Sequence, residues 1–407
     1  MSSNGFSVLR HRNFSFYLAA RIAGTLAVQM QSVAIGWQVY AQTHNLFYLG
    51  MIGLAQFLPF LLLILIAGHA ADRYNRRNII TCCVGAQLAC GLLLFAYTHS
   101  GMAAVWPVFA ILVLFGSARA FMSPATQAVL VNMVPTEDFS RAVALSSSSF
   151  QVAVILGPTL GGLLYVYGPA TVYTVSSTLL ICAVILMLLT KPAPQATRNE
   201  PATWHSVLEG LRFVFSRPIV LGAISLDLFA VLFGGATALL PALAHDVLHI
   251  GPTGLGLLRT APGAGAALCS VALAFWPITR SVGKWMFGGV AVFGVCTVIL
   301  GSTSNFVVAL VVLLLMGAGD MISVYVRHLL VQFETPDAIR GRVSAVNSVF
   351  IGASNELGEF ESGLTAGWFG LTRAVIFGGL ATLVVTGLWT RFFPVLTHMD
   401  KFPHHDK

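Results

Sequence analysis

The sequence predicts an all-α membrane protein whose twelve transmembrane helices form two pseudo-symmetric six-helix bundles. Three observations lead to this prediction. The 407 residues are 57% hydrophobic and only 9% charged, whereas a soluble domain carries about 25% charged residues. Apolar stretches of about 20 residues, the length that crosses a bilayer, recur along the whole chain. The second half of the chain also repeats features of the first half.

Twelve apolar stretches account for almost the whole sequence. They lie at residues 14–40, 46–71, 78–98, 104–132, 139–167, 170–190, 219–244, 254–277, 285–301, 305–332, 342–369 and 373–395. No long soluble domain remains between them. We therefore expect an N-terminal bundle at 1–190, a linker at 191–218, a C-terminal bundle at 219–395 and a cytoplasmic tail at 396–407.

The linker at 191–218 has two parts. It begins with a proline-rich stretch, and from about Trp204 to Ser216 it becomes amphipathic. A short amphipathic segment next to membrane spans is typical of a helix that lies along the membrane surface. We expect that placement here.

The basic residues indicate orientation rather than a nucleic-acid partner. The net charge is +7, but most Lys and Arg residues fall on one side of the membrane if both termini are cytoplasmic. Only Arg259 and Arg373 lie near helix ends on the other side. This distribution follows the positive-inside rule. We expect a multi-pass protein of the cytoplasmic (inner) membrane with both termini in the cytoplasm.

The two halves of the chain are related by a duplication. An offset of 201 residues pairs Arg141 with Arg342, and the same offset relates three pairs of glycines: Gly116 and Gly317, Gly157 and Gly358, and Gly162 and Gly363. Near the start of each half the offset is 206–207, which pairs Gly50 with Gly256 and Arg73 with Arg280. Such duplication is a feature of secondary transporters, whose substrate site lies near the bilayer midplane.

Two motifs carry a family resemblance. The loop GHAADRYNRR, residues 68–77, resembles the cytoplasmic signature of the major facilitator superfamily, and GPTLGG, residues 157–162, resembles its antiporter signature. The phrases RHRNFSFYLAARIAG, TPDAIRGRVSAVNS and LEGLRFVFSRP are most similar to the third drug:proton antiporter family, which includes the enterobactin exporter. The resemblance covers essentially the whole chain, although the helix-4 arginine motif is matched only weakly around Arg119.

The resemblance implies gating residues. In the superfamily the signature loop latches one conformation, which assigns gating to Asp72, Arg73 and Arg77, and Gly68 is expected to let its helix pack closely on a neighbour. Gly157 and Pro158 stand in mid-helix, where proline bends the helix. The alternatives are a basic loop without a gating role and ordinary helix packing.

Five ionisable residues outside the acidic stretch lie within predicted spans. They are Arg21, Arg119, Asp227, Asp320 and Arg327. The duplication relates Arg21 to Asp227 and Arg119 to Asp320, with opposite charges. The resemblance places these helices around a central cavity, so the first pair is a candidate cytoplasmic gate and the second a candidate substrate-level pair. The alternatives to these gating roles are a local ion pair between Asp320 and Arg327, and ion pairs that only hold the bundle together.

The stretch SNELGEFESG, residues 354–363, places Glu356, Glu359 and Glu361 where an apolar span is expected. With Asp227 and Asp320, five carboxylates face three intramembrane cations, so two remain unpaired. Burial favours the protonated form of an unpaired carboxylate, which makes these five residues candidates for proton coupling.

Within this stretch, Glu356 and Glu359 share a helix face and are the preferred coupling pair. Asn355 is a polar neighbour for a substrate. The alternative is that the glutamates cap cytosolic arginines or line a water-filled cavity without titrating.

The predicted function follows from these features. We expect a monomeric secondary transporter that exports a small amphipathic organic compound, a drug or a siderophore, by proton antiport. No GxxxxGK[ST] or GxSxG motif is present, so no enzyme and no cofactor are expected, and the energy source is the proton gradient. Alternatives are an importer, a lysolipid flippase or an organic-anion carrier of the same fold, or a non-transporting membrane partner of a secretion complex. The sequence HDVLH, residues 245–249, has two histidines at a spacing compatible with a metal site on a helix, but a solvated loop is the expected structure.

Overall fold

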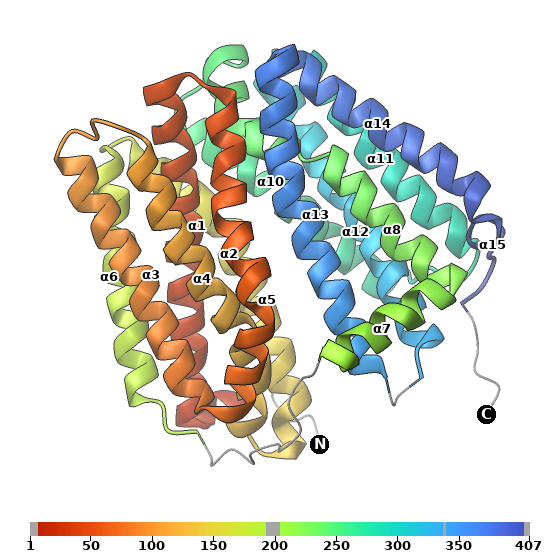
Figure 1. The fold of residues 1–407 in the computed structure, drawn as a ribbon, viewed down its shortest axis with the longest axis horizontal. Coiled ribbons are helices and arrows are strands. Elements are labelled where there is room, and N and C mark those ends of the chain that lie inside the picture. The colour runs from red at the N-terminus through yellow and green to blue at the C-terminus, as the bar shows by residue number, and fades with distance from the viewer. Residues whose placement is uncertain (1–6, 193–203, 337–338, 403–407) are drawn as a thin grey trace. The chain divides into compact units, whose positions relative to one another are not determined.

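The computed structural model describes residues 7–192, 204–336 and 339–402, and all the regular secondary structure in this part of the chain is helical. The long helices follow the predicted apolar stretches closely (Figure 1). They are α1 (Arg12–Thr43), α2 (Leu46–Arg73), α3 (Arg76–His99), α4 (Trp106–Val129), α5 (Thr136–Tyr165), α6 (Pro169–Leu189), α8 (Pro218–Phe233), α10 (Pro252–Phe275), α11 (Val282–Ser302), α12 (Phe306–Glu334), α13 (Arg340–Phe369) and α14 (Leu371–Phe392).

Among the described residues, eleven helical segments are long and apolar enough to cross a membrane. The remaining predicted span, 342–369, corresponds to α13, a continuous helix of 30 residues. It falls outside this set because its glutamates, asparagines and arginines lower the hydropathy of the whole segment. The helix therefore has the length of a span but an unusually polar composition.

The predicted span at 219–244 is not one continuous helix, which corrects the sequence interpretation. Helix α8 ends at Phe233, and Gly234 and Gly235 interrupt it. The chain continues as a 3-10 turn (Ala236–Leu239), the short α9 (Leu240–Ala242) and a π-helical turn (Leu243–Val247). Consecutive glycines disfavour a helix by about 1 kcal/mol each relative to alanine, and Pro241 follows within two turns.

The chain divides into two compact units. Unit 1 comprises Met1–Val39, Ala55–Ala202 and Pro252–Gly256, and unit 2 comprises Tyr40–Leu54, Thr203–Gly251 and Leu257–Lys407. The main division falls within the predicted linker. Two short segments are exchanged. The end of α1, the connection to α2 and the first residues of α2 group with unit 2, and the start of α10 groups with unit 1.

Close helix packing repeats in the two units according to the duplication. In unit 1, a Cβ built on Gly162 would lie 3.0 Å from the Cα of Gly256, and in unit 2 a Cβ on Gly363 would lie 2.5 Å from the Cα of Gly50. These are equivalent pairs under the sequence offsets. Small residues let helix backbones approach each other where lipid supplies no hydrophobic driving force, so the duplication is expressed in packing as well as in sequence.

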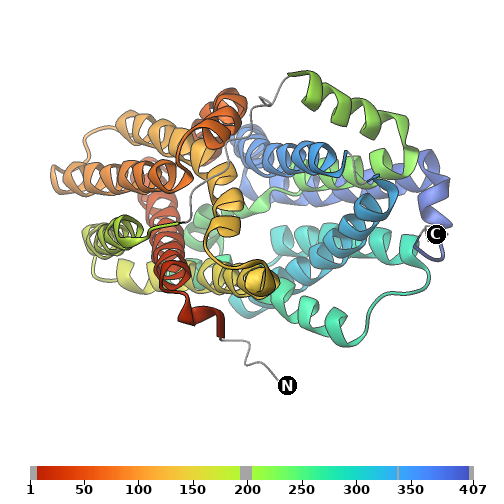
Figure 2. The same cartoon turned by 90° about the horizontal axis from the view of Figure 1, so that it is seen from below.

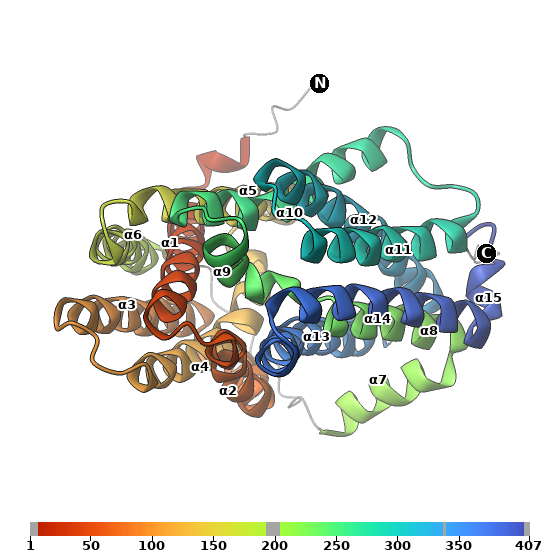
Figure 3. The ribbon, with the colours of Figure 1, turned by 90° about the horizontal axis from the view of Figure 1, so that it is seen from above.

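Within each unit the helices pack side by side. In unit 1, α3 lies against both α4 and α6 (Figures 1 and 2). In unit 2, α11 lies against both α12 and α14 (Figures 1 and 3). Leu180 of α6 is fully enclosed in the core of unit 1, and Leu226 of α8 is fully enclosed in the core that α11, α12 and α14 share in unit 2.

The predicted amphipathic segment forms helix α7, Trp204–Ser216, with the expected bounds. It crosses the start of α13 (Figure 1). Val214 is fully buried against unit 2, and a Cβ on Gly210 would lie 2.9 Å from the carbonyl oxygen of Arg342. Protein therefore covers part of the apolar face of α7.

The described part of the tail packs against unit 2. A short helix, α15 (Pro394–Thr397), buries Leu396 completely. The backbone N–H of Ser281 donates to Oδ1 of Asp400 at 3.0 Å, and the rings of Phe402 and Phe333 are 5.9 Å apart. The first residues of the predicted 396–407 tail thus hold the start of α11, and residues 403–407 lie outside the described part.

Candidate functional site

The acidic stretch of α13 lies directly against the interruption in α8. A Cβ on Gly235 would lie 2.5 Å from the carbonyl oxygen of Gly358 and 3.1 Å from Oγ of Ser362, and a Cβ on Gly358 would lie 2.8 Å from the carbonyl oxygen of Val231. The last carbonyls of a helix lack intrahelical partners. Broken membrane helices of this kind are tolerated where protein or a water-filled cavity surrounds them, and in transporters they mark binding sites.

Glu359 occupies space that a glycine of α2 provides. A Cβ on Gly53 would lie 2.9 Å from the Oε2 atom of Glu359 and 3.1 Å from the carbonyl oxygen of Glu356. Arg259 of α10 interacts electrostatically with Glu359. Residues from α2, α10 and α13 thus converge on one carboxylate within unit 2.

The position of Arg259 corrects the predicted charge balance. Arg259 was expected near a helix end, but it is the eighth residue of α10, Pro252–Phe275, and it is only partly exposed. Its charge acts on Glu359. Arg259 is therefore a fourth intramembrane cation, which the predicted balance of three cations and five carboxylates left out.

Of the three glutamates, Glu361 is the one whose carboxylate has no interaction partner in the described part of the chain. It is half-buried, and its carboxylate makes no hydrogen bond or ion pair within the described part of the chain. Only its backbone carbonyl is engaged, by the hydroxyl of Thr365 at 2.9 Å. Glu356, by contrast, has an interaction partner. The structure thus singles out Glu361, where the sequence favoured Glu356 and Glu359.

Asn355, the predicted polar neighbour, is exposed, and its Nδ2 donates to the carbonyl oxygen of Ile351 one turn earlier at 2.8 Å. This contact is local to α13. A role for Asn355 toward a substrate stays a prediction.

A second charged cluster lies deeper in unit 2. Asp227 of α8 forms an ion pair with Arg327 of α12, and the two side chains are only 7% and 3% exposed. Asp320, two turns before Arg327, lies within electrostatic range of both. The predicted local alternative paired Arg327 with Asp320, but its direct partner is Asp227.

The cations predicted to face these acids have partners in unit 1. A terminal nitrogen of Arg21 donates to Oγ of Ser146 on α5 at 2.6 Å, and the guanidinium lies 4.9 Å from the ring centre of Phe150. The Arg119 guanidinium lies 5.8 Å from the ring centre of Phe60 on α2. The Arg21–Asp227 and Arg119–Asp320 pairings therefore remain predictions about another conformation.

The signature-loop cations hold helix ends. Arg77 donates from Nε to the carbonyl oxygen of Met187 at 3.0 Å and from a terminal nitrogen to that of Leu188 at 2.5 Å. These are the last carbonyls of α6, where a cation is favoured by the helix dipole. Arg73 is exposed, and the side chain of Asp72 lies outside the described part. A gating role for these three residues remains a prediction.

The glycines of the two signatures behave differently. A Cβ on Gly68 would meet no described atom within 4 Å, so the close packing expected there is wrong. Gly157 and Gly161 of α5 do pack tightly, against Gln29 and Met30 of α1. Pro158 lies inside α5, and its carbonyl oxygen would be 2.6 Å from a Cβ on Gly256.

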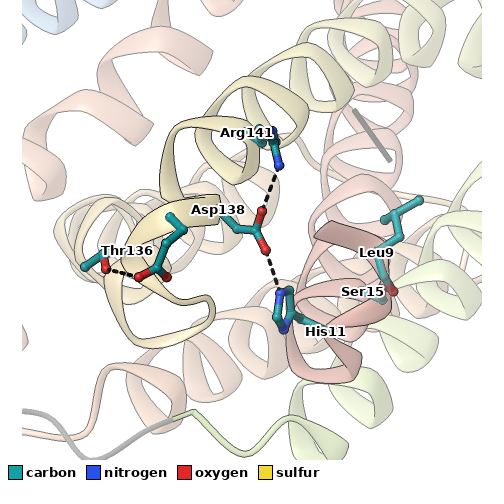
Figure 4. Close-up of polar contacts among 7 residues, drawn as sticks. Leu9, His11, Ser15, Thr136, Asp138 and Arg141 are labelled. Carbon is teal, nitrogen blue, oxygen red and sulfur yellow. Dashed lines mark hydrogen bonds and ion pairs between the residues drawn. The ribbon is translucent and has the colours of Figure 1, made fainter. Parts of the chain in front are cut away.

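The start of α5 carries a polar cluster (Figure 4). Nε2 of His11 lies 2.9 Å from Oδ2 of Asp138, and Arg141 donates to Oδ1 of the same carboxylate at 3.1 Å. In unit 2 the equivalent residue of Arg141, Arg342, pairs with Glu209 of α7 at 2.5 Å. In each unit, a polar side-chain contact ties the segment before the first helix to the start of the fifth helix.

Comparison with known proteins agrees with this architecture. A sequence profile of the family described as "Transmembrane secretion effector" matches residues 3–405. The enterobactin exporter EntS of Citrobacter koseri is 26% identical over 355 residues, covering 83% of this chain and 81% of that protein. The enterobactin exporter EntS of Escherichia coli O1:K1 is 24% identical over 401 residues, covering 93% of both.

Solved transporter structures share the fold at low sequence identity. A bacterial homologue of the human lysosomal transporter Spinster, in an inward-facing conformation, aligns with a TM-score of 0.71 at 14% identity, covering 95% of this chain and 97% of that chain. A POT family transporter in complex with 5-aminolevulinic acid aligns with a TM-score of 0.74 at 11% identity, with the same coverage.

Proposed function

Because the chain belongs to the transmembrane secretion effector family of the major facilitator superfamily, we propose that it exports an amphipathic organic compound in exchange for protons. The relatives that are enterobactin exporters support a siderophore-like substrate. A compound of that kind carries hydroxyl donors on an apolar frame. It requires a site with acceptors inside a largely apolar bundle, and the α13 stretch beside the interruption in α8 offers such acceptors.

The observation that carries the proposal is the contrast between Glu359 and Glu361. Glu359 lies within electrostatic range of the Arg259 cation, whereas Glu361 is half-buried with no ion pair in the described part of the chain. Burial without a counter-charge favours the protonated carboxyl. Glu361 is therefore the proposed proton carrier. The Glu359–Arg259 pair is proposed to line the site without exchanging protons.

Antiport would result because the proton and the substrate compete for the carboxylate of Glu361. In the deprotonated state, Glu361 accepts hydrogen bonds from substrate hydroxyl groups, and charge-assisted hydrogen bonds are about twice as strong as neutral ones. Protonation from the opposite side removes this acceptor and weakens substrate binding. The proton and the substrate then occupy the site in alternation, as exchange by alternating access requires.

Transport in liposomes with a trapped pH dye tests the proposal. Candidate siderophores and lipophilic drugs are added to wild type, Glu356→Gln, Glu359→Gln and Glu361→Gln, with Glu209→Gln of α7 as the matched exposed control. We expect substrate-driven proton movement in wild type and Glu209→Gln, and its loss in Glu361→Gln. If proton movement persists in Glu361→Gln but is lost in Glu356→Gln or Glu359→Gln, the carrier role would belong to Glu356 and Glu359 instead. Substrate movement without any proton signal would overturn proton coupling.

We further propose that both termini face the cytoplasm and that the protein acts as a monomer. The distribution of basic residues supports this orientation. A cysteine introduced in the α1–α2 connection should react with a membrane-impermeant thiol reagent applied from outside, and one introduced in the tail should not.

A further inference from the structure

Two histidines and an aspartate converge at the end of α1 that lies away from the N-terminus. His44 follows the last residue of α1, and His245 and Asp246 lie in the π-helical turn after the interruption in α8. One potential ligand atom from each of the three residues lies within 4.8 Å of the other two. His44 and His245 have ring centres 5.3 Å apart. All three residues belong to unit 2.

The sequence alone suggested a different arrangement. HDVLH has two histidines four residues apart, and the expected reading was a solvated loop. In the structure, His249 is exposed and takes no part in the three-residue group, whereas His44 comes from 201 residues earlier in the chain. A spacing argument within one segment cannot find a residue supplied by another.

Neighbouring groups orient the carboxylate. The hydroxyl of Tyr40 hydrogen-bonds Oδ2 of Asp246, and Nδ1 of His245 lies 2.7 Å from Oδ1. The Tyr40 ring also contacts both imidazoles at ring-centre distances of 5.8 and 5.9 Å. Metal-ligating carboxylates are typically held by outer contacts such as the one from Tyr40, whereas the His245–Asp246 contact joins two members of the three-residue group.

The backbone adopts unusual conformations at the same place. His44 has a φ of 47°, in the left-handed region that few residues other than glycine adopt. His245 and Asp246 stand in a π-helical turn, a conformation that is rare and often found at functional sites. The chain therefore leaves regular helix on both sides of the group, and the side chains meet as a result.

We propose that His44, His245 and Asp246 bind a divalent transition-metal ion of the Zn²⁺ class. Two imidazoles and one carboxylate form a donor set typical of zinc sites that keep an open fourth position. Imidazole nitrogen disfavours Ca²⁺ and Mg²⁺, which take oxygen ligands. Zinc–ligand bonds of about 2.0–2.2 Å place tetrahedral donors roughly 3.4 Å apart, so closure around an ion needs small side-chain rotations.

A bound ion would join two separate parts of the chain. It would hold the end of α1 to the turn that follows the interrupted α8, and these segments cannot then move apart. The ion is thus a clamp on this end of the protein rather than a part of the transport site, and its binding does not depend on which compound is transported.

Metal binding to the purified full chain in detergent, without a histidine tag, tests the proposal. We expect one equivalent of Zn²⁺ by calorimetry, and Co²⁺ should give the intense visible absorption of a four-coordinate site. Replacing an outer-shell group typically weakens metal binding 10–100-fold, so Tyr40→Phe should fall in that range. His44→Ala, His245→Ala and Asp246→Asn should each weaken binding by more than about 100-fold.

His249→Ala is the matched control, because His249 lies in the same turn region and also has a left-handed backbone, with φ 50°. It should bind Zn²⁺ as wild type does. His44→Asn keeps a polar side chain that tolerates the left-handed conformation, and it guards against a folding defect in His44→Ala. Binding that is unchanged in both His44 variants, or no stoichiometric binding in wild type, would overturn the proposal and leave a hydrogen-bonded cluster only.

Discussion

Gly363 of α13 lies so close to Gly50 of α2 that a Cβ on Gly363 would be 2.5 Å from the Gly50 Cα. The atom it would meet is backbone, which cannot rotate away as a side-chain end can. The neighbouring acidic stretch depends on this approach, because Glu359, one turn earlier, occupies the space beside Gly53 on the same helix α2.

Gly363→Ala should therefore force α2 and α13 apart. Overpacking of a close contact costs about 1–3 kcal/mol, and we expect a lower thermal midpoint in detergent together with reduced transport. Gly367→Ala is the matched control one turn later, where a Cβ would meet only Phe47 at 3.9 Å. Equal midpoints for the two variants would contradict the packing argument.

The buried pair Asp227–Arg327 should be far more sensitive than the exposed pair Glu209–Arg342. The side chains of the first pair are 7% and 3% exposed, and those of the second are 42% exposed each. Removing one partner of a buried pair costs about 3–5 kcal/mol, whereas an exposed pair contributes about 0–1 kcal/mol. Thermal midpoints should fall strongly for Asp227→Asn and hardly at all for Glu209→Gln. A comparable fall in both would mean that burial is not the cause.

Substitutions at Arg77 and Arg73 should distinguish a structural role of the signature loop from a gating role. Arg77 donates to two terminal carbonyls of α6, and Arg73 is exposed. Arg77→Gln should lower stability by about 1.5–3 kcal/mol, the contribution of a charged hydrogen bond, and Arg73→Gln should leave it unchanged. If Arg73→Gln abolishes transport at wild-type stability, gating by Arg73 is supported. If it transports normally, the predicted gating role of Arg73 is wrong.

Arg259 and Glu359 should be energetically coupled. Arg259→Gln leaves the Glu359 carboxylate without the cation that acts on it. The single change should therefore lower thermal stability more than the double change Arg259→Gln/Glu359→Gln does. A double-mutant cycle on thermal stability should give a coupling of about 0.5–3 kcal/mol. Strict additivity would show that the two residues act independently.

Zinc should slow transport if the His44 cluster clamps the end of α1. Zn²⁺ added to one face of the liposome membrane should reduce the initial rate in wild type and in His249→Ala, but not in His44→Ala. Reversal by a chelator distinguishes clamping from denaturation. Equal inhibition of all three proteins would place the zinc effect elsewhere on the molecule.

The sequence predicted the helices well because membrane spans must satisfy their backbone hydrogen bonds internally. Apolar length and the duplication were enough to locate nearly every element, and the linker helix Trp204–Ser216 appears with the expected bounds. The interruption of α8 was missed, although Gly234, Gly235 and Pro241 signal it. The hydropathy of a segment measures its apolar character, and glycine residues hardly change that value, so hydropathy does not show the break.

The site was predicted only as a set of charged residues. Which charges meet depends on helix rotation and tilt, which a single sequence does not encode locally. The sequence places Arg259 near a helix end because it lies close to the start of its span, and it offers Asp320 as an alternative partner of Arg327 because both share a helix face. The structure instead brings Arg259 to Glu359 and Arg327 to Asp227.

The exchange of short segments between the units limits how the protein can be divided. Unit 1 includes Pro252–Gly256, which lies beyond the linker in sequence, and unit 2 includes Tyr40–Leu54, which lies before it. A chain cut in the linker would give two fragments, each lacking a piece of its own fold and each carrying a piece of the other. Such fragments are expected to fold when synthesised together and to fail when synthesised alone, despite the duplicated origin of the chain.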